Sequence, residues 1–496
     1  MSSDAEILSP RAGASRAISG PTDPRRWAAL VVMLLAAFMN LLDVSIVNIA
    51  IPPIQRGLHA SYADVQWTLA GYALAYALVL ITGGRLGDAY GRKRLFLTGV
   101  AGFTIMSALC GAAQSAGMLI ASRIAQGAMG ALMIPQVLSV IQVTFPAAER
   151  IKALAAFGVT AGLGAVSGPL LGGLLTTHSL LGLGWRSIFL INVPVGAIAL
   201  IASVRLVRES RAPSPPRLDP LGVLLLSGAL VLLLYPLVEG QQAGWPAWTY
   251  LMMALSGPVL AVFAGYERIK TRRDGSPLVA LRMFAQRGFA VGMGIALVFF
   301  LGVASFGLVL TLFLQEGLGF TPLHAGATFI PFSAGVFLAS GAAARLEPKF
   351  GRGVTMSGAL IMTAGMAALI GIVHHYGTAV STPDLVPGLA LAGLGLGTVI
   401  APLANVVLGD VREQDAGSAS GVLNTGFQLG NSIGLALMGV IFIDQLTIRP
   451  GASVPRVFAA AVEHALWFQV GVFGLAFLLM LALPARRGHN TGPAPV

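Results

Sequence analysis

Long apolar stretches separated by short polar segments run through almost the whole chain of 496 residues. We count fourteen such stretches, each close to the roughly 20 residues that a helix needs to cross a hydrocarbon core of about 30 Å. The pattern predicts an all-α polytopic membrane protein with fourteen transmembrane helices, at residues 27–50, 64–84, 95–113, 117–142, 151–175, 186–206, 219–238, 248–267, 288–313, 323–344, 354–374, 385–408, 416–442 and 462–483.

An internal repeat divides these spans into two halves. The segment at 85–92 reads RLGDAYGR and the one at 345–352 reads RLEPKFGR, and an offset of 260 also carries Trp27 onto Arg287. Two basic turns of similar composition are the alternative, but many secondary transporters contain two such halves with the substrate site between them. The expected organisation is a disordered N-terminus (1–26), a six-helix bundle (27–206), a linker with two inserted helices (207–287), a second six-helix bundle (288–483) and a tail (484–496).

Composition leaves little of the chain for a soluble domain. Only 10% of the residues are charged, 56% are hydrophobic, and the mean hydropathy is +0.81, whereas soluble proteins carry about 25% charged residues. The single cysteine, Cys110, excludes an intrachain disulfide. Residues 1–26 lack the apolar core of a signal peptide, so we expect the first span to be an uncleaved anchor.

The net charge of +11 is explained by topology rather than by nucleic-acid binding. All but five of the 31 Lys and Arg residues lie in segments that face the cytoplasm if the N-terminus is cytoplasmic. This bias follows the positive-inside rule and predicts that both termini are cytoplasmic. We therefore expect a lipid bilayer as the environment and no nucleic-acid partner.

One carboxylate lies deep within the first span, in LLDVSIVNIAIPP at 41–53. Asp43 stands nine residues before Pro52, about 13 Å along a helix at about 1.5 Å per residue. Burial disfavours the charged form of a carboxyl, so a proton could bind and leave near neutral pH, with Asn40 one turn away as a hydrogen-bond partner. A structural role between helices is the alternative reading of Asp43.

Arg123 in the fourth span lies at a depth similar to that of Asp43. A nearby guanidinium would favour the charged carboxylate, so a change in their separation could load and unload a proton. Alternatively, Arg123 extends its charged end to the membrane surface or bonds backbone carbonyls. Gln126, one turn farther along, is a candidate for the polar wall of a substrate cavity.

Several other chemistries are excluded by missing motifs. None of the four lysines, Lys93, Lys152, Lys270 and Lys349, follows a glycine, so the chain has no Walker motif for ATP. No HExxH motif occurs among the seven histidines. We expect neither a metal nor a cofactor, and no catalytic residues of an enzyme.

The order and spacing of several motifs resemble those of the major facilitator superfamily, and within it the fourteen-span drug:proton antiporters. The similar stretches are LLDVSIVNIAIPP, GRLGDAYGRKR at 84–94, LIASRIAQGAMGA at 119–131, GLGAVSGPLLGGLL at 162–175, WRSIFLINVPVG at 185–196 and LDPLG at 218–222. The resemblance implies the major facilitator fold and proton-coupled export of drug-like lipophilic molecules by alternating access, from a monomer in a bacterial cytoplasmic (inner) membrane. A proton-coupled metabolite carrier and a non-transporting membrane sensor remain alternatives.

The resemblance also gives a role to the turn between the second and third spans. In the family this turn is a conformational latch, which here would comprise Gly84, Asp88, Gly91 and Arg92, with the start of span thirteen near Ala416 as its partner. A solvated basic loop is the alternative. Pro348 replaces the aspartate in the second copy of the repeat, so only the first latch is complete.

Small and amide side chains mark two further spans. The fifth span places Gly164, Gly168, Pro169, Gly172 and Gly173 about one turn apart, which favours close helix packing; its association with antiporters rests on the resemblance. In span thirteen, Asn424 and Gln428 either contact substrate or join helices.

The count of membrane acids limits the substrate charge. Spans ten and thirteen carry no acidic residue, so Asp43 is the only expected carrier and one proton enters per cycle. Moving one charge across the membrane is worth about 2.3 kcal/mol per 100 mV, so exporting a dication for one proton would oppose the membrane potential. We predict neutral, zwitterionic or monocationic substrates.

Overall fold

The computed structural model describes residues 25–178, 182–212, 217–240, 242–273, 275, 277–409, 411, 416–446 and 453–483. Two predictions, the disordered N-terminus and the cytoplasmic tail, fall on residues 1–24 and 484–496, outside this part. The described chain forms helices without strands, namely α1 (Arg26–Leu58), α2 (Tyr62–Tyr90), α3 (Arg92–Gly111), α4 (Ala116–Thr144), α5 (Ala147–Thr177), α6 (Ser187–Leu190), α7 (Asn192–Leu206), α8 (Pro220–Glu239), α9 (Ala247–Arg273), α10 (Arg287–Leu312), α11 (Pro322–Thr328), α12 (Ile330–Phe350), α13 (Arg352–Tyr376), α14 (Thr382–Leu408), α15 (Ala416–Gln445) and α16 (Val454–Leu481).

The helices confirm the predicted number of spans. Within the described residues, 13 helices are long and apolar enough to cross a membrane, and a bent pair within α2 brings the number to 14. Short helices account for the remaining elements, since α6 continues into α7 and α11 into α12 as single spans. The all-α polytopic fold class is therefore confirmed.

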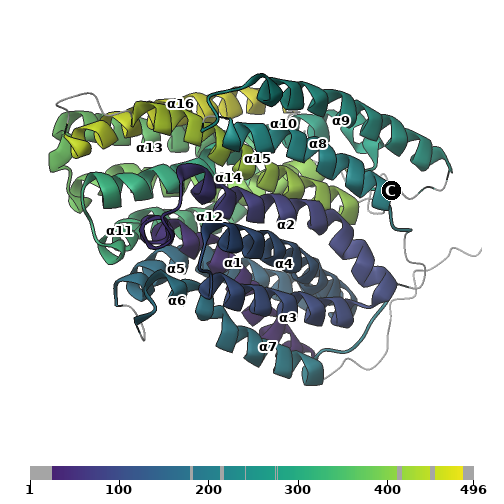
Figure 1. The fold of residues 1–496 in the computed structure, drawn as a ribbon. Helices are drawn as coiled ribbons and strands as arrows, with labels where there is room; N and C mark the ends of the chain where they lie inside the picture. The colour runs from purple at the N-terminus through teal and green to yellow at the C-terminus, as the bar shows by residue number, and fades with distance from the viewer. Residues whose placement is uncertain are drawn as a thin grey trace, which may run out of the picture.

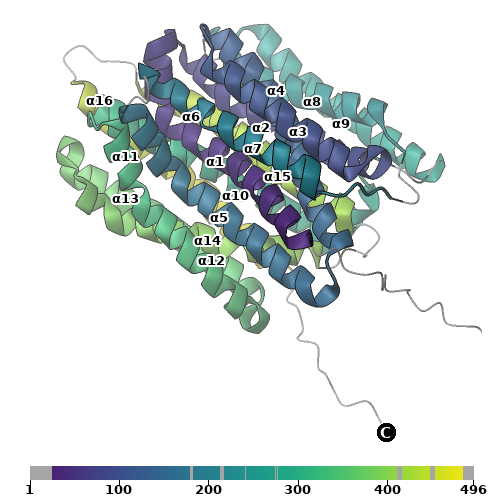
Figure 2. The same ribbon diagram turned by 90° about the horizontal axis from the view of Figure 1, so that it is seen from below.

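Helices α1–α7 pack together as one group and α10–α16 as another (Figure 1). In the first group α1 contacts α4, α5 and α7, and α4 packs between α2 and α3. In the second, α14 packs between α12 and α13, while α10 contacts α15 and α16. The two groups meet mainly through α2 against α15 and α5 against α11, with α5 running beside α11 and α12 in Figure 2.

The inserted helices α8 and α9 pack against each other at the edge of the molecule. Figure 1 shows them on the upper side, away from α3 and α7 on the lower side. Helix α8 contacts both α2 and α15, so the insertion touches one helix from each half. The division of the chain into two halves and an insertion stays a prediction about domains, and these contacts agree with it.

Helix α2 bends by 47° between its segments Tyr62–Leu80 and Thr82–Tyr90. A bend frees backbone carbonyls on its outer side, and these need new donors inside a membrane. The Gln136 side chain of α4 supplies one, because its Nε2 donates to the Gly83 carbonyl oxygen over 2.9 Å. The segment after the bend, Thr82–Tyr90, contains Asp88.

An ion pair joins the start of α1 to the start of α5. The Arg26 Nη2 and Glu149 Oε1 atoms lie 2.9 Å apart, and Arg26 Nε also donates to Glu149 Oε2. The hydrogen bonds from Arg26 hold the pKa of Glu149 below its usual value of 4.5. In the folded chain Glu149 therefore binds fewer protons than in the unfolded chain near that pH.

This ion pair should make stability depend on pH on the acid side. Its contribution is present above the unfolded value of 4.5 and is lost as pH falls through the lower folded value. Glu149→Gln should remove this part of the dependence, measured as the melting temperature in detergent against pH. An unchanged acid-side slope in Glu149→Gln would contradict the assignment.

Candidate functional site

Asp43 and Arg123 form a buried ion pair within the first bundle. The Arg123 Nη1 atom lies 2.5 Å from Asp43 Oδ2, and the two side chains are 1% and 0% exposed respectively. Breaking a buried pair by removing one partner usually costs about 3 to 5 kcal/mol, because the remaining charge has no partner. The two residues were expected at similar depths in the membrane, and in the structure their side chains are in direct contact.

Side chains from α4 and from two more helices, α3 and α7, complete the surroundings of the Asp43 carboxylate. Its Oδ1 atom accepts hydrogen bonds from Gln126 Nε2 at 3.0 Å and from Asn192 Nδ2 at 2.9 Å. Both amides also donate to Ser107 Oγ on α3, at 2.7 and 3.3 Å. Asp43 is thus fully hydrogen-bonded as an anion, and α1, α3, α4 and α7 meet at one point.

Arg123 is held by α2 as well as by Asp43. Its Nε donates to the Thr68 carbonyl oxygen at 3.3 Å, its Nη1 donates to Gln126 Oε1 at 2.6 Å, and its guanidinium carbon lies 4.2 Å from the centre of the Tyr72 ring. These contacts replace the water that a guanidinium loses on burial. The membrane-surface alternative for Arg123 is wrong, whereas its bond to a backbone carbonyl is found together with the ion pair.

The structure gives partners for two neighbouring residues. Asn40 Nδ2 donates to the Tyr72 hydroxyl at 2.8 Å rather than to Asp43. Gln126 is fully buried, and its Nε2 donates to Asp43. Contact of Asn40 or Gln126 with substrate stays a prediction, and this conformation places both with the ion pair.

Ser107 and Asn192 belong to this network but were not predicted from the sequence. Asn192 lies in WRSIFLINVPVG, a stretch noted only for its resemblance, and Ser107 lies in the third span. The rule that identified Asp43, a polar side chain within an apolar span, would have marked Asn192 too. A serine gives a weaker signal, since its hydroxyl can bond its own helix backbone.

The two amides of α15 lie in a different setting. Asn424 is exposed and donates to its own helix at Ser420 O over 3.0 Å. Gln428 is partly exposed, and its Oε1 accepts from Asn431 at 3.3 Å. Neighbouring Thr425 donates to Ala77 O of α2 at 3.2 Å, so the two amides lie on the helix that joins the halves.

The small residues of α5 allow close contact with two helices. A methyl group added at Gly164 would lie 2.8 Å from Leu41 Cβ of α1, and one at Gly172 would lie 2.9 Å from Ile46 O. At Gly168 it would overlap Ser45 of the same helix. Gly173 and Pro169 face α11 instead, each against the backbone there. The five residues thus form one packing surface toward α1 and another toward the second half.

The turn between α2 and α3 contains a paired Asp88 and Arg92. Asp88 Oδ1 accepts from Arg92 Nη2 at 2.8 Å, and the backbone of both residues pairs with the segment after α7, at Ala212 and Ser210. Gly91 has φ +114°, which side-chain-bearing residues rarely adopt, whereas Gly84 lies within α2. The partner expected for this latch, near Ala416 at the start of α15, cannot be compared with the structure, because the side chains of residues 412–418 lie outside the described ones.

Glu209 provides an unexpected cap for α3. Its two carboxylate oxygens accept from the backbone N–H groups of Lys93 and Arg94, at 3.1 and 3.3 Å.

We expect Glu209→Ala to lower the free energy of unfolding by about 1 kcal/mol, the usual loss for a helix cap. Glu209→Gln should cost less because it keeps an acceptor, and Arg94→Ala, an exposed ion-pair partner at 3.7 Å, should cost little. Equal losses in the Ala and Gln variants, in denaturation followed by circular dichroism, would contradict a capping role.

Contacts between the halves close the end of the molecule that holds the C-terminus of α1. Gln315 Nε2 donates to Ile49 O at 2.7 Å, and Arg56 Nη1 lies 3.2 Å from Glu316 Oε1. At the same end the backbone N–H of Leu323 donates to Thr177 Oγ1 at 3.0 Å. This end is therefore sealed by hydrogen bonds between the two halves.

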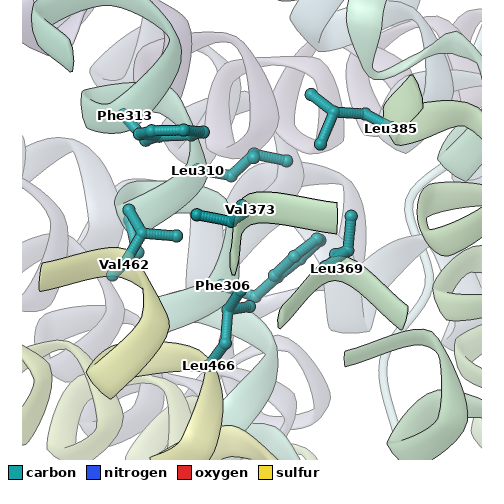
Figure 3. A pocket seen from close by; sticks show the side chains of 9 residues that line it. Phe306, Leu310, Phe313, Leu369, Val373, Leu385, Val462 and Leu466 are labelled. Atoms are coloured by element: carbon teal, nitrogen blue, oxygen red, sulfur yellow. The ribbon is translucent and has the colours of Figure 1, made fainter. Parts of the chain in front are cut away.

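The small pockets in the described part do not suit a drug-sized ligand. The one in Figure 3 lies among α10, α13, α14 and α16, has a volume of about 10 Å³, and is lined by apolar residues such as Phe306, Leu369 and Val462. A second, of similar volume, lies among α2, α10 and α15. Ligand sites usually enclose about 300 to 1,000 Å³, so we regard both as packing voids.

Comparisons of the sequence give consistent similarities. The family model described as Major Facilitator Superfamily matches residues 33–435 and again 293–495. The chain is 44% identical to a probable actinorhodin transporter of Streptomyces coelicolor, over 88% of this chain and 75% of that one. It is 35% identical to a puromycin resistance protein of Streptomyces alboniger, covering 97% and 96%, and 34% identical to a tetracenomycin C resistance and export protein of Streptomyces glaucescens, covering 89% and 82%.

Solved structures share the fold at low sequence identity. A peptide transporter described as auto-inhibited superposes with a TM-score of 0.67 at 16% identity, covering 95% of this chain and 99% of that one. A bacterial homologue of the lysosomal transporter Spinster, described as inward-facing and unoccupied, gives 0.65 at 18% identity, covering 93% and 98%. These similarities concern the arrangement of helices alone.

Proposed function

The chain belongs to the major facilitator superfamily, since that family model matches most of its length, and from this premise we propose that it exports drug-like lipophilic molecules in exchange for protons. Membership confirms the prediction of a transporter rather than an enzyme. The names of the relatives, which are transporters and resistance proteins for actinorhodin, puromycin and tetracenomycin C, support export of antibiotics.

The buried Asp43–Arg123 pair carries the proposal of proton coupling. A proton on Asp43 would remove the negative charge that holds Arg123, Gln126 and Asn192 around it. Because these residues come from α4 and α7, protonation would loosen α1 from both helices at once. Proton binding thereby changes the packing of the first bundle, which is the requirement for coupling a proton to alternating access.

The sealed end and the exposed amides support a transport path. With the N-terminus in the cytoplasm, the end closed by Arg56, Glu316 and Gln315 is the outer one, so the outer side of the path would be closed in this conformation. Asn424 and Gln428 would then meet substrate from the cytoplasmic side. Neither side chain is charged, in keeping with neutral, zwitterionic or monocationic substrates. The chain would work as a monomer in the bacterial cytoplasmic membrane, with both termini inside.

The test is compound-driven proton movement in inside-out vesicles with an acidic interior. Puromycin, tetracenomycin C and the monocation ethidium should each dissipate the pH gradient in vesicles containing the chain, and not in vesicles lacking it. A dication should do so weakly or not at all, because its export for one proton opposes the membrane potential. Binding of these compounds without any proton movement would favour a sensor, and robust export of a dication would contradict the substrate prediction.

A further inference from the structure

A second pair of buried carboxyl groups lies where the inserted helices α8 and α9 meet. Asp219 immediately precedes α8 and is 1% exposed, and Glu267 lies near the end of α9 and is 0% exposed. Neither residue belongs to the network around Asp43. Burying a charged carboxyl is costly unless hydrogen bonds or an opposite charge stabilise it.

The hydrogen-bond donors reach only one oxygen of each group. Asp219 Oδ1 accepts from the Gly222 backbone N–H at 3.0 Å and from the Tyr266 hydroxyl at 2.7 Å, and Lys270 Nζ lies 3.8 Å away. Glu267 Oε2 accepts from the Val279 backbone N–H at 3.1 Å. Asp219 thus has the donors and the nearby cation expected of a carboxylate anion.

The other two oxygens lie close to each other beside Gly222. Asp219 Oδ2 and Glu267 Oε1 are buried without a donor in the part of the chain that the structure describes. A methyl group added at Gly222 would lie 2.6 Å from the first and 2.7 Å from the second, so the two oxygens are no farther apart than the sum of these two distances. Two ionised carboxylates are both acceptors, so a hydrogen bond between them requires a proton.

We propose that Asp219 and Glu267 share one proton and form a second proton-binding site, between the inserted helices and the segment that leads into α10. Glu267 carries the proton and donates it toward Asp219 Oδ2, while Asp219 remains the anion held by Gly222 and Tyr266. One proton leaves the pair with a single negative charge beside Lys270. Loss of the proton would leave two adjacent negative charges, which repel.

The site lies where three parts of the molecule meet. Glu267 holds residues 277–279 through the Val279 N–H, and Arg85 of α2 donates to the Leu278 carbonyl oxygen at 3.3 Å. The other charged or titratable groups near the pair are Lys270 and Tyr266 on α9, with Arg217 and Arg282 exposed on the flanking segments. Deprotonation would push the carboxyls apart and loosen α9 from a segment that the first bundle also holds.

Infrared spectroscopy of the full chain in detergent tests the site directly, since a protonated carboxyl absorbs apart from a carboxylate. We expect Asp43→Asn, in which Asp43 contributes no such band, to lose one band of this kind as pH rises between about pH 5 and pH 9, where buried carboxyls titrate. In this background Glu267→Gln should lack this band, and so should Asp219→Asn, whose amide would donate to an ionised Glu267. Glu239→Gln is the matched control, because Glu239 accepts a hydrogen bond from Trp67 Nε1 at 2.7 Å and needs no proton.

A second measurement uses the dependence of stability on pH. The folded chain holds the shared proton and the unfolded chain near neutral pH does not, so stability should fall as pH rises through the titration. Glu267→Gln, whose amide keeps one donor and one acceptor, should flatten that fall, whereas Glu239→Gln should not. Absence of the band in Asp43→Asn, a band that persists in the double variant Asp43→Asn/Glu267→Gln, or stabilisation by added sodium ions in place of the band would each overturn the proposal.

Discussion

Replacing Arg123 by methionine should lower the free energy of unfolding by about 3 to 5 kcal/mol, because it leaves the Asp43 charge buried without its partner. The two atoms of the pair are 2.5 Å apart, and neither side chain reaches solvent. Methionine has a length similar to that of the arginine stem, so the loss reports the charge more than the volume. The measurement is denaturant or thermal unfolding of purified protein in detergent.

The double variant Asp43→Asn/Arg123→Met separates charge from packing. It removes both charges together and should recover most of the stability lost in Arg123→Met, because neutral groups of similar size often replace a buried pair without loss. Arg56→Met is the control. The Arg56 side chain is 63% exposed in its ion pair with Glu316, and exposed ion pairs contribute about 0 to 1 kcal/mol. A double variant as unstable as the single one would show that lost packing causes the effect.

The spans and the two central charges could be predicted because a membrane imposes strict rules on the sequence. A helix must remain apolar over about 20 residues to cross it, so the start of α1 and both ends of α4 follow from hydropathy, whereas α1 continues beyond its predicted end at residue 50 to Leu58. An aspartate or arginine inside such a run stands out at once. Counting residues from the ends of the spans then gives similar depths for Asp43 and Arg123, and the structure places them in contact.

The partners of individual side chains could not be predicted in the same way. Periodicity shows which face of a helix a residue occupies, but not which neighbour that face meets. Asn40 lies one turn from Asp43 and yet bonds Tyr72 of α2, while Asn192, 149 residues away, reaches the carboxylate instead. These contacts depend on how α2 and α7 are rotated and on the bend of α2, which no local pattern encodes.

The docking of the inserted helices is a second feature that the sequence left open. LDPLG was used only for its resemblance, although Asp219 in it caps α8 and lies beside Gly222 together with Glu267 of α9. Two acids 48 positions apart give no joint signal in a sequence, since their proximity depends on the return of α9 along α8. The same antiparallel packing brings α8 against α2 and α15.

Asp43→Asn should reduce compound-driven proton release from inside-out vesicles to the level of vesicles without the chain. Asparagine cannot gain or lose a proton in this range, and its single oxygen can accept from Arg123 or from Asn192, which donate to different oxygens of Asp43. The variant leaves the Arg123 charge without its partner and should be less stable, but the protein that folds should bind ethidium while failing to couple that binding to proton movement. Measuring binding and proton release on the same preparation distinguishes loss of coupling from loss of protein.

Asp64→Asn is the control for this experiment, because Asp64 forms the capping box of α2 through Ser61 at 2.8 Å and lies outside the Asp43 network. It should release protons as the wild type does. Undiminished release from Asp43→Asn would make the buried pair structural, and Glu267→Gln would then show whether the proton crosses through the second site. Loss of release in Asp43→Asn but not in Glu267→Gln would instead separate a transported proton from one that only holds the inserted helices in place.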